Sequence, residues 1–308
     1  MASPSPNITF RLPGLGYTFR ARLLVNENPD VVHQVLGQLP LKSVLGHVVI
    51  AGETFWTPTR IVHLGRNHMV QRHRGAVYLN APGQSICITY GKITESAKIN
   101  KFAEVFEEDL PKLEEIGKLV YQQTVALPRH TLMEVHISSE SCPRLKGPES
   151  HPVATLPASP NGHWLEVKAL IEKEIDRVWL AEPIEIQKIR WGVIDSGAGS
   201  GEQYFTVLVH LEAYLMVEFL VENFDLFEFM ADLGLESMFQ IGQLYSNALD
   251  TLASKEEYIQ LTGAMQTYIN RMHRWAYFIF PWHLGVAFPH RKPAEILSFS
   301  NAFGVTLN

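Results

Sequence analysis

A single acidic residue interrupts an apolar segment of this chain. Glu53 follows the run Val48–Gly52 and is followed almost at once by Phe55 and Trp56. A carboxyl group in apolar surroundings keeps its proton to higher pH, because burial disfavours the charged form. Such a group can donate and accept protons in turn, which is general acid–base catalysis. A Glu at the end of a strand can also point to solvent, and both interpretations are open from the sequence.

Aromatic residues accompany Glu53. The side chains that could enclose a flat ring are Phe55, Trp56, Tyr78 and Tyr90. Large aromatic side chains also fill protein cores, so Trp56 in particular fits either role. The sequence predicts a pocket with aromatic walls or an aromatic core in this region, and does not decide between them.

Basic residues follow the same segment. The arginines and the histidines between them are Arg60, Arg66, Arg72, Arg74, His63, His68 and His73. An arginine binds a carboxylate through two parallel hydrogen bonds, so this group favours an acidic small molecule. Arg60 is favoured among them, because it comes two residues after Pro58 and can fold back toward Glu53. The alternative is a loop whose charges are simply solvated.

Three elements must position these residues. Residues 16–24 alternate between apolar and polar, which is typical of a half-buried strand. Asn28-Pro29-Asp30 is a helix-start signal, and Val31–Leu39 then predicts a short helix that ends before Pro40. The apolar segment with Glu53 is a buried strand that ends at a turn near Pro58.

The order strand, short helix, strand, Gly-Glu-x-x-Trp-x-Pro resembles the bacterial cyclophilin-like family, over about residues 7–140. That resemblance implies a small closed β-barrel with helices over its ends. The whole chain resembles the cucumopine and mikimopine type of opine synthase, which carries this barrel at its N-terminal end. The implied fold class is α+β, with a cyclophilin-like β-barrel and flanking helices followed by a mainly α-helical C-terminal part.

The resemblance to these synthases also implies a reaction. It is a Pictet–Spengler condensation of L-histidine with α-ketoglutarate, which gives cucumopine or its stereoisomer mikimopine without a redox cofactor. Glu53 would be the general acid/base, and Arg60 with Arg72 or Arg74 would hold the carboxylates of the keto acid. Trp56 or Tyr90 would stack on the imidazole ring, with Phe55 as a further aromatic wall.

A non-catalytic barrel is the alternative function. The chain would then be a small-ligand-binding or prolyl-isomerase-like protein, with its C-terminal half serving oligomerisation. The cyclophilins proper carry a Phe-His-Arg stretch, and Thr59-Arg60-Ile61-Val62 is a poor substitute for it. Prolyl isomerase activity is therefore disfavoured by the sequence.

The domains expected are a barrel over residues 7–140, a linker or crossing loop over 141–161 and a mainly helical domain with a β-hairpin over 162–308. Within the barrel, apolar residues at spacings of three and four predict an amphipathic helix over 98–123 and a last strand over Thr131–Ile137. The hairpin is expected from Ile184–Ile194 and Gln203–His210. A second polar and aromatic cluster could cover the barrel, namely Arg271, His273, Arg274, Trp275, Trp282 and His283.

Composition limits the function classes. The 308 residues are 46% hydrophobic and 19% charged, as in an ordinary globular protein, and the net charge of −6 disfavours a nucleic-acid partner. Two cysteines and the lack of a secretory pattern favour a reducing, cytoplasmic location, and no apolar stretch suits a membrane. No metal-ligand or nucleotide motif is evident, so no cofactor is expected. A homo-oligomer is possible.

Overall fold

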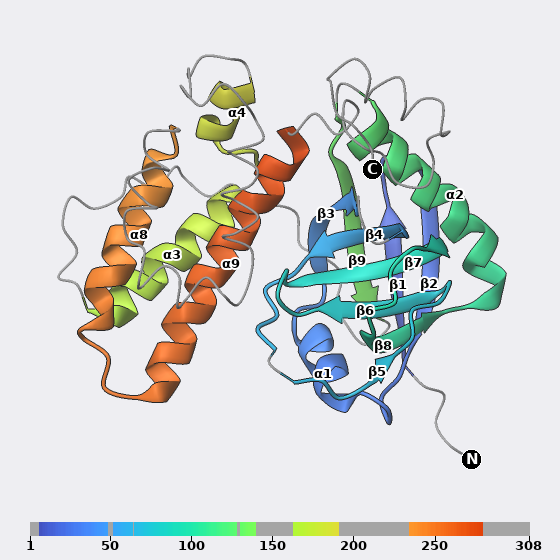
Figure 1. Ribbon diagram of the computed structural model, residues 1–308, viewed down its shortest axis with the longest axis horizontal. Coiled ribbons are helices and arrows are strands. Elements are labelled where there is room, and N and C mark those ends of the chain that lie inside the picture. Colours follow the sequence, from blue (N-terminus) through green and yellow to red (C-terminus); the bar gives the residue numbers. More distant parts are fainter. Residues whose placement is uncertain are drawn as a thin grey trace, which may run out of the picture. The chain divides into compact units, whose positions relative to one another are not determined.

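The computed structural model describes residues 6–48, 52–63, 65–127, 130–139, 163–190 and 234–279 (Figure 1). These residues fall into two compact units, 6–139 and 163–279. The first unit is made mainly of strands and the second is helical. The α+β class expected from the sequence is confirmed.

The first unit contains nine strands and three helical segments among its described residues. The strands are β1 Asn7–Leu12, β2 Tyr17–Leu23, β3 Leu41–His47, β4 Gly52–Pro58, β5 Met69–Val70, β6 Ala76–Asn80, β7 Ser85–Ile93, β8 Ile99–Val105 and β9 Met133–Ser139. The helical segments are α1 Pro29–Gly37, the short turn Glu107–Asp109 with α2 Leu110–Tyr121, and the wider turn Gln122–Ala126.

The strands form a closed antiparallel barrel. Their order is β2-β1-β9-β3-β4-β7-β6-β8, and a further pairing of β2 with β8 closes the ring. Strand β5 pairs with Ile99 and Asn100, the first residues of β8. Closure leaves the eight strands of the ring without a free edge, which is how small barrels protect their backbone groups.

Aromatic contacts identify the inner face of the barrel. Phe19 on β2 lies against Phe55 on β4, with ring centroids 6.4 Å apart, although three other strands separate β2 from β4 in the sheet order. Phe10 stacks on Phe19 at 4.7 Å, and Tyr90 lies 6.2 Å from Phe55. Successive residues of a strand face opposite sides. Trp56 and its partners in the neighbouring strands must therefore face outward.

Helix α2 covers part of this core with one apolar face. Its buried residues are Leu113, Ile116, Gly117, Val120 and Tyr121, and it contacts β2, β3, β4 and β7. Gly117 is needed for this approach, because a Cβ there would lie 2.3 Å from the ring of Tyr90. The short helix α1 instead contacts β8.

The helix predicted over residues 98–123 is wrong in its first part. Ile99–Val105 is strand β8, and α2 begins only at Leu110. The register between β6 and β8 shifts between Val77 and Tyr78, so the buried positions of β8 do not alternate strictly. A bulge of this kind produces apolar spacings of three, which resemble those of a helix. The last predicted strand is confirmed as β9.

The second unit is a helical bundle in its described part. Its helices are α3 Trp164–Val178, α4 Ile184–Arg190, α8 Glu236–Leu249 and α9 Lys255–Ile279. The first strand of the predicted hairpin is wrong, because Ile184–Arg190 is helical. The alternation of Ile and polar residues there is too short to distinguish strand from helix, and Pro183 favours a helix start. The second strand, Gln203–His210, lies outside the described residues.

Arg271 joins two helices of this bundle. Its guanidinium donates to the carbonyl oxygens of Val178, at 3.3 Å, and Trp179 at the end of α3. It also lies over the ring of Trp275, 4.5 Å from the centroid. These contacts assign Arg271 and Trp275 to packing within the helical unit. Trp282 and His283 of the cluster expected to cover the barrel lie outside the described residues.

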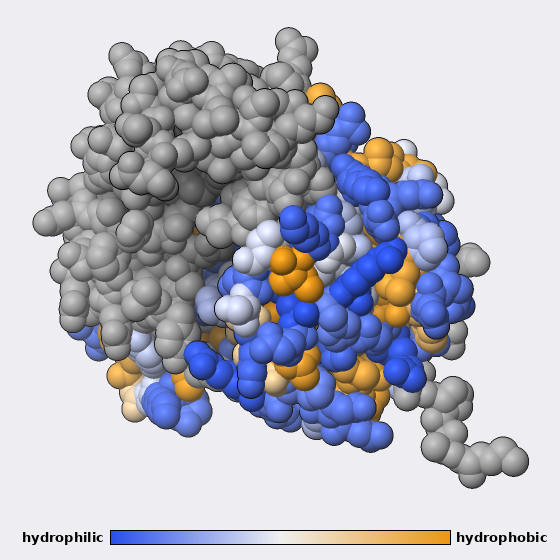
Figure 2. Space-filling view, turned by 45° about the vertical axis from the view of Figure 1, so that its right-hand side comes forward, coloured by the Kyte–Doolittle hydropathy of each residue, from blue (hydrophilic) through white to orange (hydrophobic). Residues whose placement is uncertain are grey.

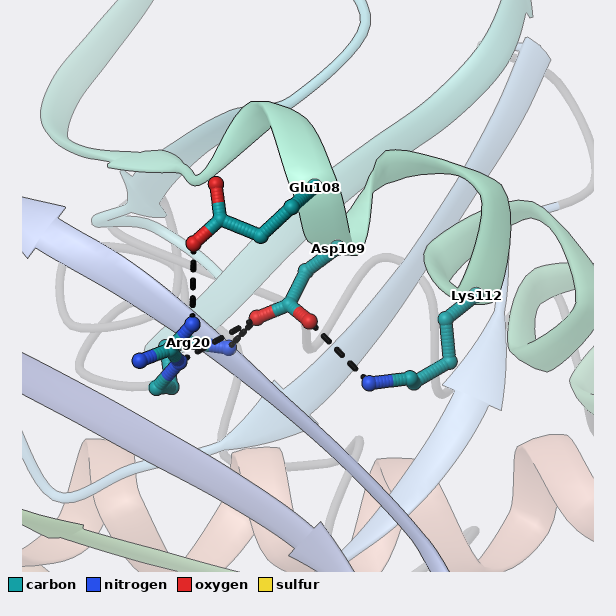
Figure 3. A network of polar contacts seen from close by, with 4 residues as sticks. All are labelled: Arg20, Glu108, Asp109 and Lys112. Carbon is teal, nitrogen blue, oxygen red and sulfur yellow. Dashed lines mark hydrogen bonds and ion pairs between the residues drawn. The ribbon is translucent and has the colours of Figure 1, made fainter.

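An ionic network fastens β2 to the start of α2 (Figure 3). The backbone N–H of Arg20 donates to the Asp109 carboxylate at 2.9 Å, and Lys112 donates to the same carboxylate at 3.0 Å. The guanidinium of Arg20 also pairs with Glu108. Burial alone would raise the pKa of Asp109, but the hydrogen bonds from Lys112 and from the Arg20 backbone outweigh it and lower the pKa.

We expect Asp109→Asn to destabilise the barrel unit by about 1.5–3 kcal/mol at neutral pH, because it removes charge-assisted hydrogen bonds. Since folding lowers the pKa of Asp109, its stabilisation is complete above the unfolded-state value of 3.8 and disappears as pH falls through the folded value. Urea unfolding of both proteins from pH 7 to pH 3 measures this. A stability difference that stays constant with pH would contradict the role of Asp109. Glu108→Gln is the control, since Glu108 is 63% exposed.

None of the helices in the described ranges combines the length and apolar character that crossing a bilayer requires. The face drawn in Figure 2 carries its hydrophobic residues in small separate patches between hydrophilic ones. No broad apolar area is evident on the visible described atoms of that face.

Candidate active site

The outer face of the barrel differs from strand to strand. On β1 and β2 the outward side chains of Arg11, Arg20 and Arg22 are exposed. On β4, β6 and β7 the outward side chains of Thr54, Trp56, Tyr78, Cys87 and Thr89 are buried, although several are polar. Burying a polar group costs free energy, because the group loses its hydrogen bonds to water. Buried polar side chains on the outer face of a barrel therefore call for an explanation.

Four outward residues form a row across four strands. Trp56 pairs with Cys87, Cys87 with Tyr78 and Tyr78 with Lys101 in the register of β4, β7, β6 and β8. Thr54 and Thr89 form a second pair beside them, with their hydroxyls 3.1 Å apart. We call Trp56, Cys87, Tyr78 and Lys101 the outer row. It supplies two aromatic rings, a thiol and an ammonium group on one surface.

Arg72 lies over this row. Its guanidinium carbon is 5.2 Å from the centroid of the Tyr78 ring, and it pairs with Glu95 at 3.2 Å. The Arg72 side chain is only 7% exposed. Burial raises the pKa of Tyr78 strongly, with Arg72 acting against that shift, so the phenol stays protonated. A buried guanidinium beside a neutral ring is suited to a carboxylate on a flat ligand.

Glu104 lies at the end of the outer row, on β8. Its carboxylate is 3.0 Å from the ammonium of Lys101, and both of its oxygens lie 3.0–3.1 Å from Nε2 of His73. The other ring nitrogen of His73 faces the carbonyl oxygen of Gln71 at 3.2 Å. Glu104 thus connects Lys101 on its own strand with His73, which precedes β6.

Glu53 lies elsewhere. It is half-buried, and its carboxylate accepts a hydrogen bond from the backbone N–H of Lys92. The carboxylate fills the space beside Gly91, where a Cβ would lie 2.0 Å from Oε2. The pairing of β4 with β7 is irregular at this point, between Gly52 and Thr54. Glu53 thus sits at a bulge near Tyr90, away from the outer row in the register.

Phe55 and Tyr90 belong to the inner face. Phe55 is fully buried, and the hydroxyl of Tyr90 lies 2.9 Å from Nε2 of His47. Nδ1 of His47 faces the carbonyl of Val48, so Nδ1 carries a proton and Nε2 accepts from Tyr90. Burial, followed by the charge of Glu53, raises the pKa of Tyr90. These residues are a hydrogen-bonded part of the barrel core.

Two other predicted arginines, Arg60 and Arg74, make contacts with residues outside the outer row. Arg60 follows β4 and its backbone N–H donates to the side chain of Gln38 at 3.0 Å. Arg74 is 42% exposed and pairs with Glu114 on α2 at 3.0 Å. Of the predicted residues, the structure brings together Trp56, Arg72 and Tyr78, and separates them from Glu53, Phe55, Tyr90 and Arg74.

Sequence reasoning missed three residues of this surface, Cys87, Lys101 and Glu104. The apolar spacing predicts a helix over the segment that contains Lys101 and Glu104, and in a helix these two side chains would face water. In the bulged strand, Lys101 instead pairs with Tyr78, over whose ring Arg72 lies. Over the described ranges, no group of three or more His, Cys, Asp or Glu side chains could hold a metal ion.

Comparisons with known proteins bear on both units. Residues 164–217 and 214–279 match the family model of the cucumopine synthase C-terminal helical bundle domain. The solved structure of McbB in complex with tryptophan aligns with a TM-score of 0.72 and 24% identity, covering 90% of this chain and 97% of that chain. At this identity the similarity shows a shared fold.

A second solved structure is more distant. The solution structure of the hypothetical protein AF2241 from Archaeoglobus fulgidus aligns over 44% of this chain and 96% of that chain, with 15% identity and a TM-score of 0.33. No curated protein sequence matches the chain significantly. The barrel and the helical unit nevertheless each have a counterpart, the first in the McbB fold and the second in the matched family. Residues 164–279 therefore carry the helical bundle domain found at the C-terminus of cucumopine synthases, and the chain shares the fold of McbB.

Proposed function

We propose that this chain condenses L-histidine with α-ketoglutarate in a Pictet–Spengler reaction, giving cucumopine or its stereoisomer mikimopine. The match of the helical unit to the cucumopine synthase domain is the observation that carries this proposal. The bound tryptophan in the McbB structure, an amino acid with an aromatic ring, supports a substrate of the same class here. The outer row, with Arg72 above it, offers the aromatic rings and charged groups that such substrates would need.

The reaction combines the two substrates and releases one water. The amine of histidine attacks the keto carbon, and the resulting carbinolamine loses water to give an iminium ion. The unsubstituted imidazole carbon Cδ2 then attacks the iminium carbon and closes a six-membered ring. Cδ2 finally loses its proton, which restores the aromatic ring. No electrons enter or leave, so the proposed reaction needs no redox cofactor.

Two carboxylates are candidates for the proton transfers, Glu53 and Glu104. The geometry favours Glu104, because it lies on the same face as Trp56, Tyr78 and Arg72 and has His73 as a second proton carrier. Protonated His73 or Glu104 would donate to the departing hydroxyl, and the Glu104 carboxylate would accept the proton of Cδ2. Glu53 is the alternative that the sequence alone favours.

Arg72 is our candidate for binding the keto acid. Its guanidinium is buried over Tyr78, and its partner Glu95 is 42% exposed and can yield to a substrate carboxylate. Trp56 and Tyr78 would border the imidazole ring from the barrel side. Holding the amine and the ketone together lowers the activation free energy by up to roughly 7–11 kcal/mol when their orientation is ideal.

Incubation of the purified protein with histidine and α-ketoglutarate, without added cofactor, tests this function by mass spectrometry. We expect a product whose mass is that of the two substrates minus one water. Binding of either substrate without conversion would instead favour a ligand-binding barrel, and conversion that requires NADH would favour a reductase. Either result would overturn the proposal.

A further inference from the structure

Asn28 occupies the N-cap position of α1 but does not cap the helix. An asparagine at this position ordinarily accepts a hydrogen bond from the first turn. Here no such bond forms, and the side chain is fully buried. Instead, Nδ2 of Asn28 donates to Oδ1 of Asn100, at 2.8 Å, and to the carbonyl of Lys101, at 3.0 Å. The helix start thus loses a local bond in favour of contacts more than 70 positions away.

Asn100 carries the connection onward to the residues that precede Arg72 and His73. We call residues 65–74 the arginine loop. The side chain of Asn100 accepts from the backbone N–H of His68 and donates to the carbonyl of Gly65, both at 3.3 Å. The neighbouring backbone N–H of Lys101 donates to the carbonyl of His68 at 3.1 Å. One buried amide therefore touches α1, β8 and the arginine loop.

Helix α1 holds this region at further points. The side chain of Gln34 lies 3.1 Å from Nδ1 of His63, and Asn67 donates to the carboxylate of Asp30. Figure 1 shows α1 beside β8 and β5 at one end of the barrel, where these contacts occur. The start of the arginine loop is thus fixed to two regular elements before it reaches Arg72.

We propose that Asn28 and Asn100 are positioning residues that hold the arginine loop, and with it Arg72 and His73, over the outer row. Both asparagines are buried. Removing one of their hydrogen bonds therefore leaves a buried polar group unsatisfied, which costs stability. Where a sequence breaks a local structural rule, as it does here at a helix start, the position is often under a functional constraint. The role of this pair in catalysis rests on the proposed function, whereas its role in holding the loop does not.

Asn28→Ser separates the two roles of Asn28. Serine is a good N-cap residue, so it can support α1 locally, but it is too short to keep both bonds to β8. We expect a modest fall in the melting temperature, because a new cap bond offsets part of the loss of the buried bonds. We expect the 65–74 amide hydrogens to exchange at least ~10-fold faster in deuterium-exchange measurements. We also expect kcat/KM to fall about 10-fold, mainly through a higher KM for the keto acid.

Val32→Ala is the matched control. Val32 is buried on α1 but forms none of these polar contacts, so the variant should lower the melting temperature and leave the 65–74 exchange and the KM unchanged. Should Asn28→Ser fail to fold, Asn100→Ala supplies the same test, since it removes both loop contacts and leaves Asn28 bonded to the Lys101 carbonyl.

The outcomes distinguish this inference from the proposed function. Unchanged exchange in Asn28→Ser would overturn the positioning role, whatever the activity. Faster exchange with full activity and unchanged KM would overturn its relevance to catalysis. Faster exchange in a protein whose wild type forms no product would support the positioning role and reject the proposed function.

Discussion

Glu104→Gln is expected to lower kcat by about 10²–10⁴, the usual contribution of a positioned acid–base group. The amide keeps the size of the side chain and can still bond to Lys101, but it can no longer accept the proton of the imidazole carbon. His73 would also lose its carboxylate partner at 3.0 Å. Steady-state kinetics with both substrates varied, followed by mass spectrometry, measures the effect.

Glu53→Gln is the matched control for this prediction. Glu53 is also a glutamate on a barrel strand, but it bonds to the Lys92 backbone away from the outer row. We expect this variant to stay within a few-fold of the wild type. A large loss in Glu53→Gln together with a small one in Glu104→Gln would assign the acid–base role to Glu53 instead.

Arg72→Met is expected to lower kcat/KM for α-ketoglutarate by about 10- to 100-fold, because a charge-assisted pair with a carboxylate contributes roughly 1.5–3 kcal/mol. The loss should appear mainly as a higher KM, since the carboxylate is bound in both the ground state and the transition state. The KM for histidine should change less. Initial rates at saturating histidine give the comparison.

Arg74→Met controls for the loss of a positive charge nearby. Arg74 is two residues away, but it is directed to Glu114 on α2 and is largely solvated. Its replacement should leave both KM values within about two-fold. Equal effects of the two substitutions would mean that Arg72 acts only through the overall charge, and would contradict a direct contact with the keto acid.

The barrel and the helical C-terminal part could be predicted from the sequence, because the order of their elements resembles that of the cyclophilin-like family and of the cucumopine and mikimopine type of opine synthase. Local patterning sufficed where it was regular, as in α1 and in β9. It failed at β8, where a bulge places Phe102 and Ala103 both in the core and produces a helical spacing. It also failed at α4, whose seven residues are too few to establish a period.

The candidate site was only partly predictable. Residue type identified Trp56, Tyr78 and Arg72, but the sequence gives no information on which face of the barrel a strand residue occupies until the register is known. Phe55 and Trp56 are neighbours in sequence and lie on opposite faces. Glu104 could not be identified from its neighbours in sequence, because its partner His73 is 31 positions away and reaches it only through the pairing of β6 with β8.

The fate of one hydrogen tests the central claim most directly. With histidine deuterated at Cδ2 of the imidazole ring, ring closure must replace that deuterium by the new carbon–carbon bond. We predict that the product carries no deuterium. Its mass should equal that of unlabelled histidine plus α-ketoglutarate minus one water. A product that keeps the deuterium, or that contains two added hydrogens, would show that the ring does not close at Cδ2 and would contradict the proposed reaction.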